Sequence, residues 1–181
     1  MSQYRVKIYP CNGRLFTAAS LKEEAAIAPT QIAPKAESTA RDGPLQVRGR
    51  YANVDYGFRV DVPAGLVGEG STPPAPNHGF AIEFGEKSVL CVDASYEMPD
   101  SPHVFHRFNA RLGKLQAERR SWSDSEGGIK LLHESIVARG FDRHTPIIYT
   151  IQLDTTAEHQ SDGLRVLEAL TASSRTIPVR P

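Results

Sequence analysis

The sequence predicts an α+β domain, an antiparallel sheet flanked by helices, with an N-terminal extension before it. Three observations predict this fold class. Runs in which apolar and polar residues alternate, the pattern of half-buried strands, follow one another from residue 50 onward. Most connections between these runs are short, and short connections favour antiparallel pairing. The helical segments do not alternate regularly with the strands, as they would in a doubly wound fold.

The N-terminal part of the chain differs in composition from the rest. Residues 28–44 contain three prolines among Ala, Thr, Ser and Lys, with few large apolar side chains. This composition is typical of an extended, solvated linker. We therefore expect residues 1–44 to form an N-terminal extension and Pro/Ala-rich linker, and residues 45–181 to form the α+β domain.

The domain begins with a predicted hairpin at residues 50–62. Phe58, Val60 and Val62 alternate with charged residues, so one face of the second strand is apolar. Pro63 ends this strand because proline cannot donate to a sheet ladder.

A long loop and a second hairpin follow. Residues 64–79 are rich in glycine and proline and predict a surface loop. Residues 80–84 and 88–95 have the pattern of two paired strands. Cys91 lies in an apolar run of the second of these, so we expect a buried core thiol and no disulfide with Cys11, which lies in a polar turn.

A helix is predicted at residues 102–112. Ser101 is a suitable N-cap, Pro102 is suited to the first helical position, and Gly113 is a suitable C-terminal stop. The apolar stripe of this helix consists of Val104, Phe105, Phe108 and Leu112.

Three strands and a second helix complete the domain. The strands are predicted at residues 115–122, 129–138 and 146–155, the helix at 163–172 with Asp162 as its cap, and a last short strand at 174–179. The third of these strands is rich in β-forming residues and is expected at the centre of the sheet. We expect the core to consist of Phe58, Val60, Val62, Phe80, Ile82, Phe84, Leu90, Val92, Phe105, Phe108, Ile148, Ile151, Leu167 and Leu170.

Composition disfavours two classes of partner. Lys+Arg and Asp+Glu both total 21, which gives a formal net charge of +0, whereas nucleic-acid-binding proteins usually carry a basic surface. No apolar run approaches the ~18 residues that a membrane span needs. We therefore expect neither nucleic-acid binding nor a membrane span.

Several segments resemble the PsbP-like fold, which is shared with the Mog-type Ran-binding proteins and with bacterial periplasmic and lipoprotein families. The segments are YANVDYGFRVDVPAGL, PPAPNHGFAIEF, LGKLQAERRSW, IIYTIQLDTT and DGLRVLEALTASSR, and the resemblance extends from about residue 50 to residue 177. It implies an antiparallel sheet with helices on its faces. Because the fold has no common catalytic motif, and its members are mostly binding, assembly or accessory proteins, the resemblance implies no catalytic residue and no cofactor.

The resemblance leaves the compartment and the oligomeric state open. Bacterial relatives of this type are expected to carry an export signal, which would place the protein in the periplasm. Residues 1–10 contain charges but no apolar segment typical of such a signal, so the sequence as written favours the cytoplasm.

The loop at residues 65–79 is the predicted recognition surface, because loops longer than ~12–15 residues without structure of their own are usually functional or disordered. Its tandem prolines limit disorder. We expect the binding residues to be Pro73, Pro74, Asn77 and His78, extended by Arg119, Arg120 and Trp122 if their strand edge is exposed. The alternatives are that residues 77–79 form a simple turn, or that His78 acts as a general base.

The other histidines give no metal site. His103 and His106 would share a face of the predicted helix, but a zinc site needs a third ligand and no HExxH is present. His133 and Glu134 lie next to each other on a predicted strand, so their side chains point to opposite faces.

The sequence favours a non-enzymatic binding or accessory module that recognises a protein partner. An immunity or chaperone protein of a bacterial secretion system is one concrete form of this hypothesis. The alternative is a small hydrolase-like or metal-dependent enzyme that uses His78. A third is a structural domain attached to a larger assembly by the N-terminal segment.

Overall fold

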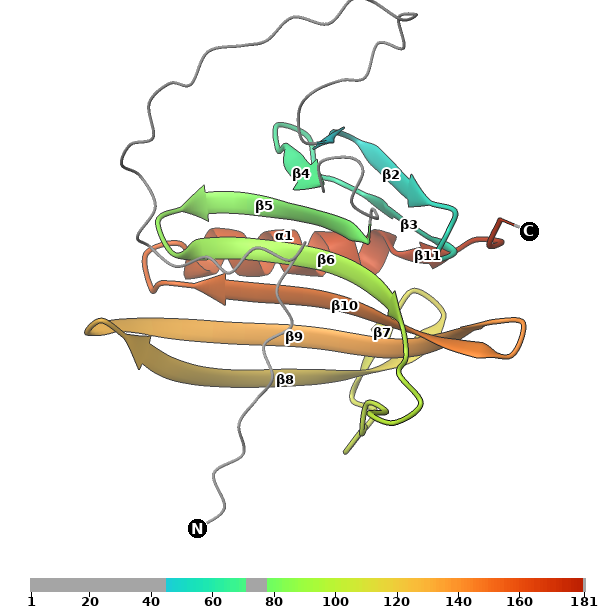
Figure 1. Ribbon diagram of the computed structural model, residues 1–181. Coiled ribbons are helices and arrows are strands. Elements are labelled where there is room, and N and C mark those ends of the chain that lie inside the picture. Colours follow the sequence, from blue (N-terminus) through green and yellow to red (C-terminus); the bar gives the residue numbers. More distant parts are fainter. Residues whose placement is uncertain (1–44, 71–77, 181) are drawn as a thin grey trace, which may run out of the picture.

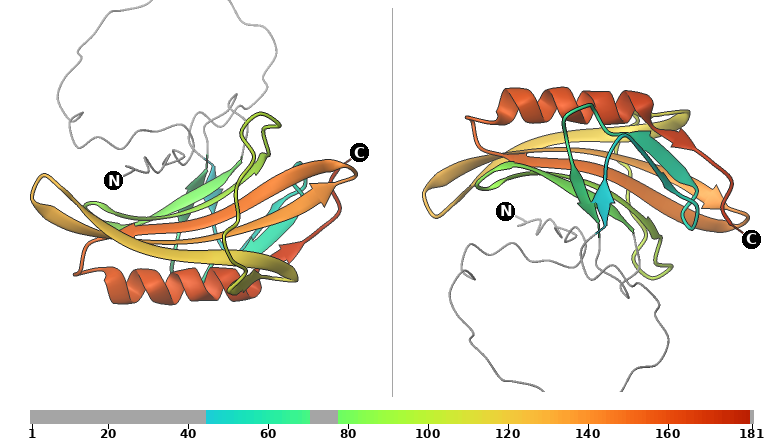
Figure 2. Two further views of the ribbon diagram at one scale, coloured as in Figure 1. Left: turned by 90° about the horizontal axis from the view of Figure 1, so that it is seen from below. Right: turned by 90° about the horizontal axis from the view of Figure 1, so that it is seen from above.

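The computed structural model describes residues 45–70 and 78–180. In this part of the chain, an eight-stranded antiparallel sheet carries a single α-helix on one face, and a three-stranded sheet lies beside the helix (Figures 1 and 2). The strand order of the large sheet is β1-β4-β5-β6-β10-β9-β8-β7. The predicted α+β class with antiparallel pairing is therefore confirmed.

The large sheet is built from consecutive hairpins. Its strands are β1 (Gln46–Val47), β4 (Gly68–Gly70), β5 (Gly79–Gly85), β6 (Ser88–Tyr96), β7 (Ala110–Leu112), β8 (Leu115–Glu126), β9 (Ile129–Asp142) and β10 (Thr145–Thr155). The predicted hairpin of β5 and β6 and the predicted strands β8, β9 and β10 are confirmed. β4 lies inside the segment that we expected to be a loop throughout.

The helix α1 (Gln160–Ser173) covers the apolar face of the large sheet. Its buried residues, Val166, Leu167 and Leu170 among them, pack against the side chains of β10 that point to the same side. Gly163 allows the helix to lie close to the sheet, because a Cβ there would be 2.7 Å from Leu153 Cδ1. The predicted C-terminal helix is therefore confirmed, but its N-cap is His159, and Asp162, the predicted cap, lies in the first turn.

The small sheet closes the end of this apolar layer. It consists of β2 (Arg50–Asn53), β3 (Phe58–Asp61) and β11 (Arg175–Thr176), in the order β11-β3-β2. Phe58 and Val60 are buried in the core, as predicted. The hydroxyl of Tyr149 donates to the carbonyl of Tyr56 (2.9 Å) and so connects β10 to the turn of this sheet.

The predicted helix at residues 102–112 is wrong. Residues 102–109 have no regular secondary structure, and β7 follows them. Two glutamates accept hydrogen bonds from the backbone of this segment. Glu97, directly after β6, accepts through Oε1 from His103 N (2.7 Å), and Glu118, on β8, accepts through Oε2 from His106 N (3.3 Å). These tertiary contacts replace the helical ladder, so the described part of the sheet is flanked by one helix rather than several.

The predicted core is right at most positions and wrong at three, Phe105, Phe108 and Ile148. Phe84 is partly buried and packs against the core, whereas Phe105 is partly buried outside it and Phe108 is 59% exposed. Ile148 is only partly buried, because Ile147 is the residue of this pair that faces α1, with 0% exposure. Cys91 is also partly buried rather than a core thiol, since Leu90 and Val92 occupy the inward positions on β6.

Within the described residues, no helix is long and apolar enough to cross a membrane.

Candidate functional site

The face of the large sheet opposite α1, here called the open face, carries most of the charged and polar groups of the sheet. Register defines it: Trp122, His133 and Asp154 form one row across β8, β9 and β10. The rows that follow contain Arg120 with Ser135 and Gln152, Glu118 with Val137 and Thr150, and Arg139 with Ile148. The open face is therefore a polar surface on a rigid sheet.

One end of the open face is covered by the loop of residues 97–109. Glu97 Oε1 accepts hydrogen bonds from Arg139 Nη2 (2.5 Å) and from the backbone of His103 (2.7 Å). The same Arg139 nitrogen donates to the His103 carbonyl (2.8 Å), and the guanidinium lies 5.0 Å from the centre of the Phe105 ring. Arg139 and Glu97 thus fix the start of the loop to β9.

A second ion pair fixes the middle of the loop. Glu118 is only 2% exposed and accepts hydrogen bonds from Arg120 Nη2 (2.7 Å) and from the backbone of His106 (3.3 Å). Burial raises the pKa of Glu118, but these hydrogen bonds and the charge of Arg120 outweigh it and hold the pKa below its ordinary value. Arg120 also donates to the Val104 carbonyl (3.1 Å). The loop is therefore held by two buried carboxylates.

The outer side of this loop exposes large apolar side chains. Met98, Val104 and Phe108 are 62%, 64% and 59% exposed, and Phe141, at the end of β9, is 66% exposed. These residues form one region. Glu97 N donates to the carbonyl of Pro146 (2.9 Å), which is the register partner of Phe141, so the chain leading to Met98 leaves the sheet with one strand, β10, between it and Phe141.

The rest of the region is connected through aromatic contacts. Phe108 stacks on Phe105 at 5.3 Å, and Phe105 lies against Arg139, which shares a face of β9 with Phe141. Arg107 and Arg143 are exposed next to these groups in sequence. We call Met98, Val104, Phe108 and Phe141, together with Arg107 and Arg143, the loop-end surface.

The other end of the open face contains a histidine between two aspartates. His133 is 5% exposed, with Nδ1 2.7 Å from Asp154 Oδ1 and Nε2 3.1 Å from Asp124 Oδ1. Its ring stacks on Trp122, with centroids 5.0 Å apart and an angle of 10°. Burial lowers the pKa of His133, but the hydrogen bonds to both aspartates outweigh it, so the pKa is raised. The two aspartates therefore hold both ring nitrogens of His133 and favour its charged form.

This arrangement does not converge on a metal ion. The two ring nitrogens of His133 point to different carboxylates, so they and the aspartates do not share one centre. Over residues 45–70 and 78–180, no group of three or more His, Cys, Asp or Glu side chains is placed to hold a metal.

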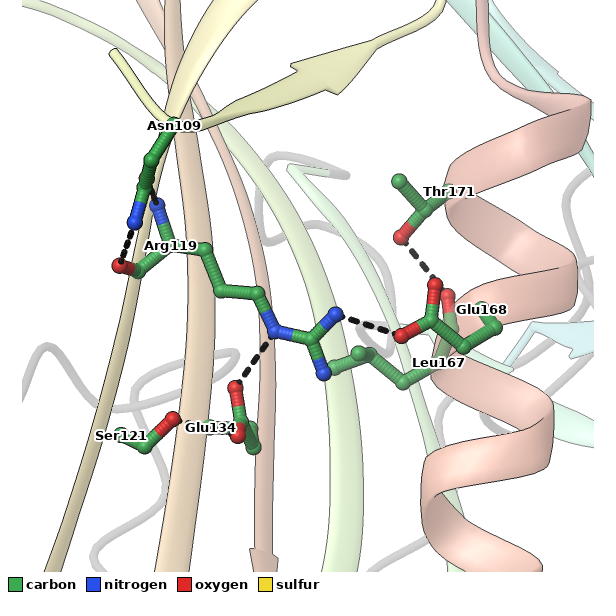
Figure 3. A network of polar contacts seen from close by, with 7 residues as sticks. All are labelled: Asn109, Arg119, Ser121, Glu134, Leu167, Glu168 and Thr171. Atoms are coloured by element: carbon green, nitrogen blue, oxygen red, sulfur yellow. Dashed lines mark hydrogen bonds and ion pairs between the residues drawn. The ribbon is translucent and has the colours of Figure 1, made fainter.

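Arg119 lies on the opposite face of β8 from Arg120 and connects the sheet to α1 (Figure 3). Its Nε donates to Glu134 Oε2 (2.9 Å) and its Nη1 to Glu168 Oε1 (2.5 Å), as Figure 3 shows. Glu134 also accepts from Ser121 Oγ (2.5 Å). Arg119 therefore has partners within the fold, and His133 and Glu134 lie on opposite faces, as predicted.

His78 precedes β5, on the other side of the sheet. Its Nδ1 is 3.0 Å from the Ala94 carbonyl and its Nε2 3.4 Å from the Tyr56 hydroxyl, and its ring packs on that of Tyr56 at 4.9 Å. The strand order puts three strands between β5 and β8, so His78 and β8 are about 19 Å apart at ~4.8 Å per strand.

Of the predicted binding residues, the structure brings only Arg120 and Trp122 onto one surface, the open face. Arg119 lies on the α1 face, and His78 lies near another edge of the sheet. Pro73, Pro74 and Asn77 are outside the described residues. Sequence reasoning missed Glu97, Glu118, Arg139 and Phe141, although alternation along β8 already places Glu118, Arg120 and Trp122 on one face.

Asp93 is the one acid with a strongly raised pKa among the described groups. Burial raises it to about 6, and the nearby charge of His78 only partly opposes this. Asp93 and Thr150 border a cavity of about 20 Å³ that lies between β10, β7 and the end of α1. A cavity of this size holds about one water molecule and no organic ligand.

No protein-family model matches the chain, and no curated protein matches it in sequence. Among solved structures, it is similar to the PsbP protein (CyanoP) of Synechocystis sp. PCC 6803, with 12% identity and a TM-score of 0.37 over 79% of this chain and 98% of that one. It is similar to LpqN of Mycobacterium tuberculosis, which is involved in cell envelope biogenesis, with 11% identity and a TM-score of 0.40 over 76% of this chain and 87% of that one.

A protein of Bacteroides thetaiotaomicron VPI-5482 is similar at 12% identity and a TM-score of 0.39, over 77% of this chain and 54% of that one. TM-scores of 0.37 to 0.40 assign neither a family nor a function.

Proposed function

We propose that this protein is a non-enzymatic binding or accessory module that recognises a protein partner through the loop-end surface. The observation that carries the proposal is the exposure of Met98, Val104, Phe108 and Phe141, each 59% to 66% accessible, in one region at one end of the sheet. Aromatic residues, Met and Arg are the residue types enriched where proteins bind one another.

The loop-end surface is held in position before any partner binds. Its loop is tied to the sheet by the hydrogen bonds of Glu97 with Arg139 and of Glu118 with Arg120 and the His106 backbone. A fixed loop loses little conformational entropy on binding, so more of the contact energy contributes to affinity. This rigidity supports recognition of a partner of matching shape.

The geometry gives less support to an enzyme that uses His78. Both ring nitrogens of His78 have a neighbouring protein group, the Ala94 carbonyl and the Tyr56 hydroxyl. The cavity beside Asp93 is too small for a substrate, and His78 does not line it. An immunity or chaperone role in a secretion system remains the narrower form of the proposal, and it would use the same surface.

Partner capture tests the proposal. The full chain, immobilised through its C-terminus, is used as bait in an extract of its source organism, and bound proteins are compared between variants. Replacing Phe108 and Phe141 together by serine should reduce capture at least tenfold, because central aromatic contacts each contribute about 2 kcal/mol or more. Ile129→Ser is the matched control, since Ile129 is also exposed but lies at the start of β9, at the other end of the strand from Phe141.

Equal capture by the wild type and by the folded double variant would refute the proposal. Loss of capture in both the double variant and Ile129→Ser would also refute it, because the effect would not be specific to the loop-end surface. Circular dichroism and the thermal midpoint of each variant establish that the fold persists.

A further inference from the structure

The outer edge of β8 is open along half of the strand. β8 pairs with β9 from Ala117 to Glu126, but on its other side it pairs only with β7, which is three residues long and reaches no further than Ala117. Within the described residues, no strand pairs with the outer edge beyond this point. Figure 1 shows β8 at the lower border of the sheet, extending well past β7.

The side chain of Asn109 shows how this edge accepts a peptide group. Its Oδ1 accepts from Arg119 N (2.7 Å) and its Nδ2 donates to Arg119 O (3.1 Å), a pair of bonds that Figure 3 also shows. A carboxamide has the same donor and acceptor as a peptide unit, so Asn109 occupies the position that the next strand would take. It also establishes that the N–H and C=O of Arg119 point outward.

The alternation of backbone direction along β8 then identifies the N–H and C=O groups that face the open edge. In an antiparallel strand, every second residue directs both backbone groups to the same neighbour. Because Arg119 points outward, Ser121, Ser123 and Ser125 do so as well, while Trp122 and Asp124 bond to β9. None of these three serine backbones has a partner on the outer side within the part of the chain that the structure describes.

The side chains along this edge determine which kind of peptide strand can bind there. Trp122, Asp124 and Glu126 project to the open face, and the two carboxylate side chains are 55% and 64% exposed. Asp124 is bonded to His133 through Oδ1, and Glu126 lies 3.6 Å from Lys87 through Oε2, so each has a second oxygen for another cation. His133 stacks on one face of the Trp122 indole from the side of β9, which leaves the other face toward the open edge.

Serine side chains alternate with these groups on the α1 side, and they place no bulk beside an approaching strand. Lysine and arginine are attracted both to carboxylates and to an indole face. An extended segment with basic side chains on one face therefore complements the edge.

A second copy of this edge complements it less well. Two β8 edges that paired antiparallel about Ser123 would place each Asp124 diagonal to the Asp124 of the other copy, where like charges repel. Charged residues on an edge strand are a common protection against such self-pairing. The charge of the edge thus favours a basic partner over self-association.

We propose that residues 121–125 of β8 bind an extended, basic peptide segment of a protein as an added strand, with its Lys or Arg side chains against Trp122 and Asp124. The outward backbone groups of Ser121, Ser123 and Ser125 provide the hydrogen bonds, as in other cases of strand addition. This site is separate from the loop-end surface and does not depend on it.

The test uses the full chain and a synthetic heptapeptide, acetylated and amidated, of sequence Thr-Lys-Val-Lys-Thr-Lys-Val. Binding is followed by amide chemical shifts in NMR spectra. We expect saturable shifts at Ser121, Ser123 and Ser125, and none at Met98 or Phe108. Ser123→Pro removes an outward N–H that has no partner in the described fold and should weaken binding at least tenfold, whereas Ser123→Ala keeps this N–H and should bind as the wild type does.

N-methylated peptides keep the proposal testable if Ser123→Pro does not fold. Methyl groups on the alternate nitrogens that face β8 should abolish binding, and methyl groups on the other alternate nitrogens should leave it unchanged. A peptide with Glu in place of Lys should bind at least tenfold more weakly.

Three results would overturn the proposal: no shifts with the Lys peptide at millimolar concentration, equal binding by Ser123→Pro and Ser123→Ala, or equal binding of the two N-methylated series. A concentration-dependent dimer that Ser123→Pro abolishes would reassign the edge to a second copy of the chain. Partner capture through the loop-end surface is unaffected by any of these outcomes, so the two proposals fail separately.

Discussion

Replacing Ile147 by alanine should destabilise the fold much more than the same change at Ile148, its neighbour in β10. Ile147 is 0% exposed and belongs to the core under α1. Ile148 points to the open face, where it is partly buried opposite Arg139. Both substitutions remove the same atoms from the same strand, so the difference between them measures only the two environments.

The magnitudes follow from burial. Isoleucine to alanine removes three carbon atoms, worth about 2.4 kcal/mol of transfer free energy at ~0.8 kcal/mol each. At Ile147 a cavity is left between sheet and helix, so the total loss should be about 3 to 4 kcal/mol. At Ile148 solvent reaches part of the side chain and no closed cavity forms, so the loss should be about 1 kcal/mol. The difference between the two variants is therefore about 2 to 3 kcal/mol.

Urea unfolding of the two variants and the wild type, followed by circular dichroism, measures this difference. The slope of the free energy against urea concentration should stay the same in all three proteins, so that the midpoints report stability alone. Equal losses of stability at the two positions would contradict the register of β10 and the assignment of the core to the α1 face. A larger loss at Ile148 would invert the assignment.

Further predictions concern the charged residues, the helix contact and the extension. The pKa of His133 is raised because both aspartates favour its charged form. The charged histidine therefore stabilises the fold fully below the ordinary pKa of ~6.5, and this stabilisation is lost as the pH rises through the folded-state pKa. His133→Gln should therefore reduce the free energy of unfolding more at pH 5.5 than at pH 9. Burial raises the pKa of Asp93 to about 6, so the folded state favours the protonated carboxyl, and this contribution to stability is lost as the pH rises through about 6. Asp93→Asn should therefore stabilise the protein at pH 7.5 and have little effect at pH 4. Equal effects at the two pH values would contradict the burial of this carboxyl. Gly163→Val should cost about 1 to 3 kcal/mol in urea unfolding because the Cβ position lies 2.7 Å from Leu153, and an unchanged midpoint would refute the close contact of α1 with β10. Removal of residues 1–44 should leave the thermal midpoint almost unchanged, and a large decrease would show that this segment stabilises the domain.

Strands β6 and β10 could be predicted from the sequence because each has one face under α1. This gives β6, for example, an alternation in which Leu90 and Val92 are buried and Cys91 between them is not. The phase of an alternation is harder to predict where neighbouring residues are both apolar. Ile147 and Ile148 are such a pair, and only Tyr149, Ile151 and Leu153 beyond them show which of the two points inward.

The helix at residues 102–112 could not be excluded from local signals. Ser101, Pro102 and Gly113 are all suitable for the ends of a helix, and the apolar spacing fits one. The contacts that decide against it are tertiary: Glu97, which directly follows β6, and Glu118, on β8, accept hydrogen bonds from this backbone. The separation of His78 from Trp122, which were expected on one surface, could not be predicted for the same reason. It depends on the order of strands in the sheet rather than on any local sequence pattern.

Asn109 connects the two surfaces proposed for binding. It is the last residue of the loop that carries Phe108, and its side chain forms, among the described residues, the final pair of hydrogen bonds along the outer edge of β8. The backbone of Arg119, which receives these bonds, belongs to the residue that ties the sheet to α1 through Glu134 and Glu168. A strand added next to Asn109 would therefore continue a hydrogen-bonded edge that is already fixed to the helix, and would not have to order it first. The same contacts hold the loop end beside that edge, so a single partner with an apolar segment and a basic strand could use both surfaces with little loss of conformational freedom in this protein.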